Sequence, residues 1–174
     1  MKAPPAVSII GWSGVGKTTL VERLVPELRS RGLRVGVVKH SSDAHPLHRS
    51  GSDTARFGQS GAALVAFATP VGVQLSVQED PAHALLPLLE KFGDWVELVL
   101  VEGWKDGPLP KLEVWREGFG PLLAATRPDV LAVVTDAPKL PEGSPERLRR
   151  FGTAELQELA GFITLLAREQ AHEP

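Results

Sequence analysis

One segment near the N-terminus combines residue types and a spacing that could bind phosphate: Gly11, Trp12, Ser13, Gly14, Val15, Gly16, Lys17 and Thr18. It matches the pattern G-x-x-x-x-G-K-[ST] in full, directly after an apolar run and directly before residues with helical spacing. Its glycines allow backbone N–H groups to point inward around a β-phosphate, and the following helix adds the positive end of its dipole. The segment therefore predicts a P-loop that binds the phosphates of a nucleoside triphosphate. The alternative is a glycine turn that happens to precede a lysine.

The side chains of this segment have separate roles in the prediction. Lys17 neutralises the β- and γ-phosphate oxygens as a point charge, which makes it a catalytic candidate. Thr18 offers its hydroxyl to Mg²⁺, and Thr19 bonds the α-phosphate. The predicted nucleotide contacts here are Gly11, Ser13, Gly14, Val15, Gly16, Lys17, Thr18 and Thr19.

A carboxylate is expected near the Mg²⁺, at the carboxyl end of a neighbouring buried strand, because the metal prefers oxygen ligands. Glu102 directly follows the apolar run 98–101 and fits that place. We therefore predict Glu102 as a catalytic and metal-side residue. Asp is the more usual residue there, and the longer Glu favours a contact through water. An ordinary surface glutamate after a strand is the alternative.

The polar segment 41–52 is typical of a functional loop. Asp53 and Asp43 lie on or beside it, where a carboxylate could approach the γ-phosphate, and Asp53 is a further catalytic candidate. Helix N-capping explains an Asp after Ser52 equally well.

Three histidines of the same region, His40, His45 and His48, form with Asp43 a cluster that could hold a transition metal. Their spacing fits no standard metal site. Loop histidines or phosphate contacts are therefore the preferred interpretation.

Apolar periodicity predicts an alternation of strands and helices. Strands are expected at 7–11, 35–38, 62–69, 71–77, 98–101, 112–115 and 130–134, and helices at 17–31, 53–59, 81–92 and 153–168. This order is typical of the α/β class. We predict a three-layer P-loop NTPase fold with a mainly parallel sheet and helices on both faces. The adjacent pairs at 62–77 and 98–115 suggest antiparallel additions to that sheet.

Length and composition indicate one nucleotide-binding domain, because 174 residues with 43% apolar content can form a closed core. Nineteen basic and 21 acidic residues give a formal net charge of −2, so we expect no nucleic-acid partner. The absence of cysteine excludes disulfides and thiolate metal sites and fits a reducing cytoplasm. Residues 1–6 resemble neither a signal peptide nor a membrane span, so a cytoplasmic protein without membrane association is expected.

Four stretches, in order, resemble the family of molybdopterin-guanine dinucleotide biosynthesis protein B (MobB). They are residues 11–19, Val37-Val38-Lys39-His40, the stretch from Gly51-Ser52-Asp53-Thr54 to Gly61-Ala62, and Leu98-Val99-Leu100-Val101-Glu102-Gly103-Trp104-Lys105 followed by Pro110-Lys111-Leu112-Glu113-Val114. The last stretch is the most selective of the four.

The resemblance implies a GTP-binding adaptor with weak GTP hydrolysis, acting with Mg²⁺ and forming a homodimer. Its implied partner is a MobA-like nucleotidyltransferase that joins GMP to molybdopterin. It also implies that Lys39, His40 and Asp53 border the nucleotide phosphates and that Glu102 occupies the metal-side carboxylate position. The sequence Ser41-Ser42-Asp43 departs from the more usual His-rich stretch of the family, which weakens a metal role for that loop.

Guanine recognition needs a separate candidate, because a chain without Asn cannot contain an N-K-x-D element. Asp136 follows the strand 130–134, where such a base reader would lie, and its carboxylate could accept two bonds from the N1 and N2 edge of guanine. A turn-forming Asp before Ala137 and Pro138 is the alternative.

Two other classes of P-loop protein compete with the adaptor. A small-molecule kinase would need an Arg-rich lid over the transferring phosphoryl group, and the chain offers Arg147, Arg149 and Arg150, which are more simply a solvated stretch. A metal-insertion GTPase would use the histidine loop as its metal carrier, and the lack of cysteine disfavours it.

Overall fold

The computed structural model describes residues 3–41, 46, 48–77 and 85–172. The predictions about Asp43 and His45 therefore lie outside the described residues. The chain packs as two compact units, Met1–His40 with Pro87–Pro174 and Ser41–Leu86, and each is described by itself. The single domain expected from chain length stays a prediction.

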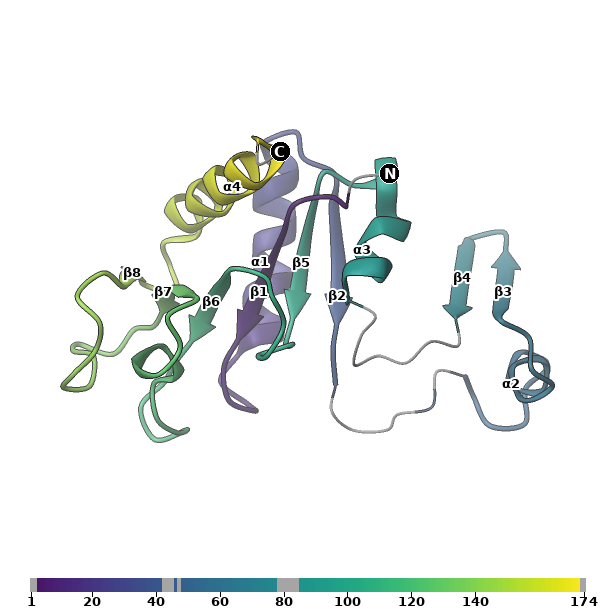
Figure 1. Ribbon diagram of the computed structural model, residues 1–174, viewed down its shortest axis with the longest axis horizontal. Coiled ribbons are helices and arrows are strands. Elements are labelled where there is room, and N and C mark those ends of the chain that lie inside the picture. Colours follow the sequence, from purple (N-terminus) through teal and green to yellow (C-terminus); the bar gives the residue numbers. More distant parts are fainter. Residues whose placement is uncertain (1–2, 42–45, 47, 78–84, 173–174) are drawn as a thin grey trace. The chain divides into compact units, whose positions relative to one another are not determined.

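The first unit is built on a six-stranded sheet (Figure 1). Its strands are β1 (Ala6–Ile10), β2 (Val35–Lys39), β5 (Leu98–Glu102), β6 (Lys111–Val114), β7 (Val130–Val134) and β8 (Arg149–Phe151). Its helices are α1 (Lys17–Ser30), most of α3 (Leu85–Phe92), α4 (Leu156–His172) and the short 3-10 helices η2 (Gly93–Trp95) and η3 (Leu123–Ala125).

The strands lie in the order β2-β5-β1-β6-β7-β8, and every neighbouring pair is parallel. Their carboxyl ends therefore meet at one edge of the sheet, where ligands of open α/β folds bind. All residues of β1 and β5 are buried, as expected for central parallel strands covered on both faces. This arrangement brings the loop after β1 and the end of β5 together.

The prediction of an antiparallel pair at 98–115 is wrong. β5 and β6 flank β1 on opposite sides, and both run parallel to it. A parallel return usually needs a long crossover. Here β6 is staggered toward the carboxyl edge: Glu102 at the end of β5 is level with Ile9, and Lys111 at the start of β6 is level with Ser8. The short connection 103–110 therefore has to step back by only one position along β1.

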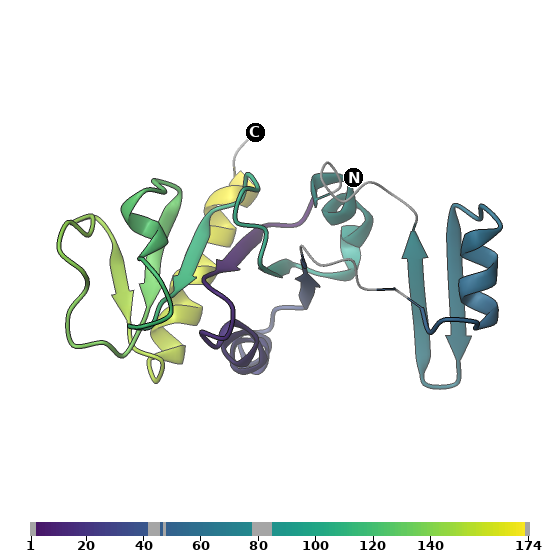
Figure 2. The same ribbon diagram turned by 90° about the horizontal axis from the view of Figure 1, so that it is seen from below.

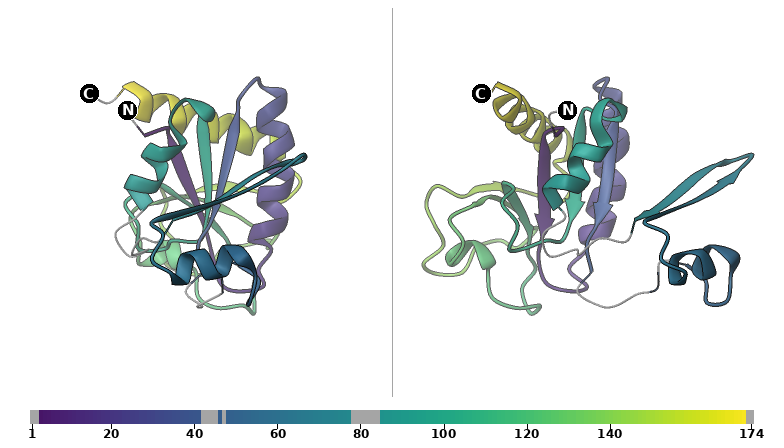
Figure 3. Two further views of the ribbon diagram at one scale, coloured as in Figure 1. Left: turned by 90° about the vertical axis from the view of Figure 1, so that its right-hand side faces the viewer. Right: turned by 45° about the vertical axis from the view of Figure 1, so that its right-hand side comes forward.

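Helices cover both faces of the sheet, which confirms the three-layer prediction. On one face α1 and α4 pack on a common core that includes Ile9 of β1 and Leu100 of β5. On the other face α3 packs on β2, where a β-carbon at Gly36 would lie 3.4 Å from the ring of Phe92. Figures 2 and 3 show α1 and α3 on opposite sides of β2.

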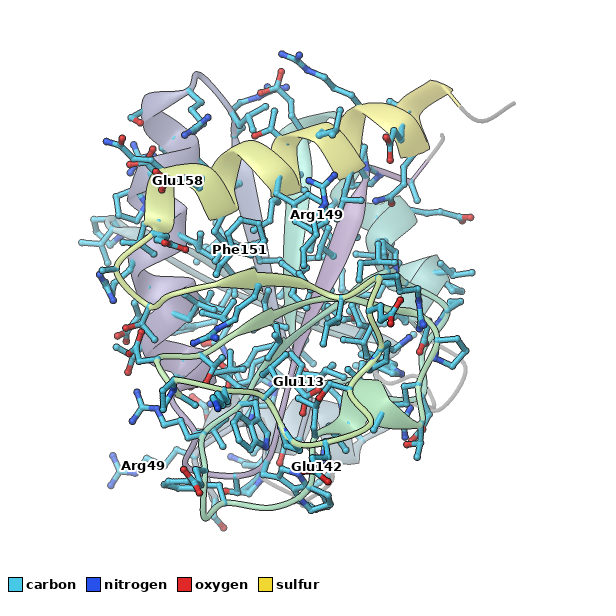
Figure 4. All side chains as sticks on the ribbon, turned by 90° about the vertical axis from the view of Figure 1, so that its left-hand side faces the viewer. Arg49, Glu113, Glu142, Arg149, Phe151 and Glu158 are labelled. Carbon is cyan, nitrogen blue, oxygen red and sulfur yellow. The ribbon has the colours of Figure 1, made fainter. Side chains whose placement is uncertain are left out.

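The sheet has one strand that the apolar pattern does not predict. Arg149, Arg150 and Phe151 form β8, which pairs with β7 at the edge of the sheet. These arginines are exposed, as the interpretation of a solvated stretch expects, but Arg149 and Arg150 belong to a strand, and the Arg149 guanidinium lies 4.7 Å from the ring centre of Phe162. Figure 4 shows Arg149 and Phe151 beneath α4. Phe151 packs on the same Phe162 ring, 5.6 Å between centres.

The second unit contains α2 (Asp53–Gln59) and an antiparallel hairpin of β3 (Leu64–Thr69) and β4 (Gly72–Val77). This hairpin and α2 confirm the predicted elements at 53–59 and 62–77. The hairpin forms a two-stranded sheet of its own and is not hydrogen-bonded to the parallel sheet as an added pair of strands. Several large apolar side chains of the unit are exposed, namely Phe57, Leu64, Phe67, Val71, Val73 and Leu75. Among the described helices of both units, none combines the length and apolarity needed to cross a membrane.

Candidate phosphate-binding site

The loop between β1 and α1 has the backbone of an anion nest. Gly11, Gly14 and Gly16 have φ values of 142°, 78° and 102°, a region that other residues rarely adopt. A β-carbon at Gly11 would lie 2.4 Å from the carbonyl oxygen of Val114, so that position requires glycine for space as well. Gly16 caps α1, and its carbonyl accepts the first helical bond from Leu20 N at 3.0 Å. The loop therefore directs the start of α1 toward the sheet edge.

The predicted contact residues of this loop divide into exposed and buried positions. Ser13, Gly14, Thr18 and Thr19 are exposed, so a ligand can reach them. Val15 is fully buried and belongs to the core below the loop. Its side chain therefore anchors the loop, and its N donates to the Trp12 carbonyl at 3.5 Å, so its predicted nucleotide contact stays a prediction.

Lys17 curls back over the loop that precedes it. Its Nζ donates to the carbonyl oxygens of Trp12 at 2.8 Å and of Gly11 at 3.2 Å. Burial lowers the pKa of Lys17, the charge of Glu102 opposes that shift, and the nearby charges of Lys105 and Lys39 add to it. The ammonium is thus held at the mouth of the loop among other cations, an arrangement that favours an anionic ligand.

Glu102 meets Thr18 and Lys39 at the carboxyl edge of the sheet. Thr18 Oγ1 donates to Glu102 Oε1 at 2.8 Å, and Lys39 Nζ lies 3.4 Å from the same oxygen. Glu102 is only 8% exposed, which rules out the ordinary surface glutamate considered above. A hydroxyl and a carboxylate side by side form an oxygen set that suits Mg²⁺, so the residues present fit the predicted metal.

His40 and Trp104, which follow the ends of β2 and β5, stack on each other with ring centres 4.4 Å apart. His40 N donates to the Glu102 carbonyl at 2.9 Å, and a β-carbon at Gly103 would lie 2.9 Å from the His40 carbonyl oxygen. Trp104 itself has φ 60°, a conformation that is strained for a side chain of this size. The ends of β2 and β5 are therefore tightly joined, with His40 fixed next to Glu102.

Asp136 follows β7, two strands away from β1, and is exposed. Its two carboxylate oxygens accept from Thr153 N at 2.7 Å and from Thr153 Oγ1 at 2.5 Å. These two hydrogen bonds lower the pKa of Asp136. The carboxylate is therefore ionised and oriented at the sheet edge, and its role toward guanine stays a prediction.

Asp53 lies in the second unit, as the first residue of α2. The cap of α2 is Ser52, whose hydroxyl accepts from Ala55 N, so capping does not explain Asp53. Its side chain is 83% exposed and lies 3.7 Å from Arg56. The P-loop that Asp53 is predicted to serve belongs to the first unit, so the catalytic role of Asp53 stays a prediction.

The predicted histidine cluster gains no support from the described residues. Within them, no group of three or more His, Cys, Asp or Glu side chains could hold a metal ion. His40 instead stacks on Trp104 in the first unit, whereas His48 belongs to the second.

Three residues near the loop are not among the sequence candidates. A β-carbon at Gly16 would lie 3.2 Å from Arg116 Nη2, and one at Gly14 would lie 3.3 Å from the ring of Phe119. Lys105 lies 4.6 Å from the ring centre of Trp12. The signal that could have found Arg116 is its place just after a buried strand, but sequence alone does not tell that this strand is the neighbour of β1.

The MobB family profile, described as molybdopterin guanine dinucleotide synthesis protein B, matches residues 6–136. The chain belongs to the MobB family. The matched range runs from β1 through the P-loop and Glu102 to Asp136, so the resemblance found in the sequence is confirmed.

Individual MobB proteins are similar over most of their length. The chain is 36% identical to the molybdopterin-guanine dinucleotide biosynthesis adapter protein of Haemophilus influenzae, over 77% of this chain and 76% of the relative. It is 32% identical to the adapter protein of Escherichia coli, over 77% and 79%. A crystal structure of molybdopterin-guanine biosynthesis protein B superposes with a TM-score of 0.69 and 29% identity, covering 94% of this chain and 99% of that one.

Proposed function

We propose that this chain is a GTP-binding adaptor with weak GTPase activity in the synthesis of molybdopterin guanine dinucleotide. It would assist a MobA-like nucleotidyltransferase that attaches GMP to molybdopterin. The observation that supports this most is the hydrogen bond from Thr18 to Glu102 beside the glycine loop, in a chain of the MobB family. Relatives named as adapter proteins support the same role.

Each site residue has a defined task in this proposal. The N–H groups of the glycine loop and Lys17 hold the phosphates, and Thr19 bonds the α-phosphate. Thr18 and Glu102 would hold Mg²⁺, which neutralises charge on the β- and γ-phosphates when bound. Lys39 balances Glu102 and faces the γ-phosphate end, and Asp136 reads the guanine edge. In this proposal Asp53 also serves the phosphates.

An adaptor needs a way for the nucleotide to change the rest of the molecule. Lys39 and His40 are the last residues of the first unit before the chain enters the second. Contacts with the γ-phosphate would therefore act at this connection, and their loss after hydrolysis would change the chain's affinity for its partner.

A homodimer is part of the proposal. The hairpin β3–β4 exposes Leu64, Val73 and Leu75 on one face within one chain, and such apolar exposure marks interaction surfaces. A second copy of this chain is the expected occupant.

Calorimetric titration of the purified chain tests the nucleotide assignment directly. GTP, GDP and ATP are each titrated with and without Mg²⁺, and phosphate release is followed in parallel. We expect GTP to bind more tightly than ATP, Mg²⁺ to strengthen GTP binding, and hydrolysis to be slow. A clear preference for ATP, or transfer of phosphate to an acceptor, would refute the adaptor assignment in favour of a kinase.

A further inference from the structure

Arg116 lies against the residue that opens α1. A β-carbon at Gly16 would be 3.2 Å from its Nη2 and 3.7 Å from its Cζ, so the guanidinium faces the end of the glycine loop. The side chain is exposed, and a ligand in the loop can therefore reach it. The backbone amides at this end of a P-loop are those that cradle the α- and β-phosphates.

The segment that carries Arg116 is fixed at both ends. Trp115 is buried, its N donates to the Val134 carbonyl at 3.1 Å, and its Nε1 donates to the Gly120 carbonyl at 3.0 Å. Trp12 of the loop donates from Nε1 to the Pro121 carbonyl at 2.8 Å. The backbone of the arginine is thus tied to the loop, and a guanidinium placed in advance loses less entropy when a ligand binds.

The guanidinium of Arg116 is not neutralised by an ion pair within the described residues. Within the described part of the chain, no carboxylate forms an ion pair with it, and Asp136, which senses its charge, has both oxygens bonded to Thr153. Glu102, by contrast, is already matched by Lys39 and Thr18. A guanidinium beside a nest of N–H groups has the fork geometry that binds phosphate oxygens in pairs.

The order of the strands indicates which phosphates the Arg116 guanidinium faces. β5 and β6 lie on opposite sides of β1. Glu102, which ends β5, and Arg116, which follows β6, therefore flank the loop from opposite sides. The Glu102 side is the side of Mg²⁺ and the γ-phosphate. Arg116 lies on the side of β7 and Asp136, toward the proposed base.

We propose that Arg116 is a nucleotide-binding residue that contacts the α- and β-phosphates on the base side of the loop. This inference rests on the proposed nucleotide site and adds a ligand contact to it. GTP and GDP share these two phosphates, so Arg116 contributes equally to the binding of both and has no part in holding the γ-phosphate.

The test compares Arg116→Gln and Arg116→Lys with the parent protein by calorimetric titration of GTP and GDP. Arg116→Gln is expected to weaken both ligands by the same factor, about 10-fold or more, because a charge-assisted hydrogen bond is lost. Arg116→Lys keeps the positive charge but lacks the paired N–H donors of the guanidinium. Its affinity for both ligands is expected to lie between those of Arg116→Gln and the parent. Thermal unfolding without nucleotide is expected to match the parent.

Arg29→Gln is the matched control, because Arg29 lies in the last turn of α1, about 20 Å along the helix from Gly16. It makes the same charge change and is expected to leave both affinities unchanged. Unchanged binding of GTP and GDP in Arg116→Gln would overturn the proposal, as would a loss confined to GTP. If the parent protein prefers ATP, the GTP assignment is refuted but the proposal for Arg116 is not. The same comparison of variants is then made with ATP and ADP, which also share the α- and β-phosphates.

Discussion

Lys17 and Lys111 are both held by main-chain carbonyls, yet only Lys17 is open to a ligand. Lys17 donates to Gly11 and Trp12 from a half-buried position at the mouth of the loop. Lys111 has no exposed surface and donates to the carbonyls of Gly107 and Leu109 and to Asp129. The first can therefore exchange its partners for phosphate oxygens, whereas the second is part of the fold.

Lys17→Ala is expected to abolish measurable GTP binding and to leave thermal unfolding of the nucleotide-free protein nearly unchanged. The reason is that the ammonium contacts only the loop, while the core beneath it is formed by Val15 and other apolar side chains. Calorimetry and a thermal melt measure the two quantities. Arg29→Ala, in the last turn of α1 and about 20 Å along the helix from Gly16, is the control. Equal GTP affinity in Lys17→Ala and the parent would contradict the assignment of the loop.

Glu102→Gln is expected to lower Mg²⁺-dependent GTP turnover and to reduce the gain in affinity that Mg²⁺ gives. The amide can still accept from Thr18, but it carries no charge for the metal or for Lys39. Phosphate release at several Mg²⁺ concentrations measures the change. The control is Glu158→Gln on the exposed side of α4 (Figure 4). Parent-like turnover at every Mg²⁺ concentration would remove Glu102 from the metal site.

Asp136 gives a pH-dependent prediction. Its two bonds from Thr153 lower its pKa in the folded protein, so its contribution to stability is present above the ordinary value of 3.8 and is lost as pH falls through the lowered pKa. Thr153→Val removes the hydroxyl bond and leaves the backbone bond. The pKa of Asp136 is expected to rise toward its ordinary value, as measured by carboxyl NMR titration. An unshifted titration curve would show that the hydroxyl does not hold the carboxylate.

At this scale the sequence predicts those residues whose partners are local or whose position follows from a strand end. Lys17 and Thr18 belong to one contiguous motif, and Glu102 follows the most apolar strand. Arg116 could not be predicted, because its place beside Gly16 depends on β6 lying next to β1. Which strands lie next to each other depends on the topology of the whole sheet.

Among the elements, those with strong apolar periodicity were predictable and those held by side-chain contacts were not. β1, α1 and β5 follow the predicted ranges within one or two residues. β8 has two arginines in three residues and no apolar run, and it forms because Phe151 and Arg149 pack on Phe162 of α4. The stagger of β6 is likewise invisible in a pattern of apolar residues.

The connection between β6 and η3 depends on Glu113, whose two oxygens accept from Leu123 N and Ala124 N at 2.8 Å each. Burial raises the pKa of Glu113. Glu113→Gln presents an NH₂ group to one of these N–H donors, so one bond is lost inside the protein. We expect the free energy of unfolding to fall by about 1–3 kcal/mol.

Urea denaturation of the nucleotide-free protein measures this change, with Glu117→Gln at a nearby exposed position as the control. If Glu113→Gln has the same free energy of unfolding as the parent, the buried carboxylate does not hold η3.

For the whole molecule, the exposed hairpin predicts a dimer that depends on apolar contacts. Val73→Lys places a charge on β4 and is expected to shift the protein from dimer to monomer in light scattering after gel filtration. GTP affinity is expected to remain, since the P-loop belongs to the first unit. Gln74→Lys, an exposed polar position in the same strand, is the control. A parent protein that is monomeric at micromolar concentration would contradict the proposal.

The division into two units was only partly visible in the sequence. The polar segment 41–52 indicates a break in the α/β pattern, yet α2 and the hairpin have the periodicity of ordinary elements. The sequence does not show which side chains of each strand are buried by neighbouring elements. The apolar pattern predicts a strand at 62–69, but it does not tell that Leu64 and Phe67 of that strand are exposed within one chain.

The enclosed ammonium of Lys111 has a consequence for covalent chemistry on this chain. Its three donors have three acceptors, and no reagent can approach the amine while β6 keeps its neighbours. Acylating agents and trypsin therefore encounter Lys111 only in molecules that have opened. The fraction of Lys111 that becomes acylated, measured by mass spectrometry, therefore reports the fraction of molecules that have unfolded.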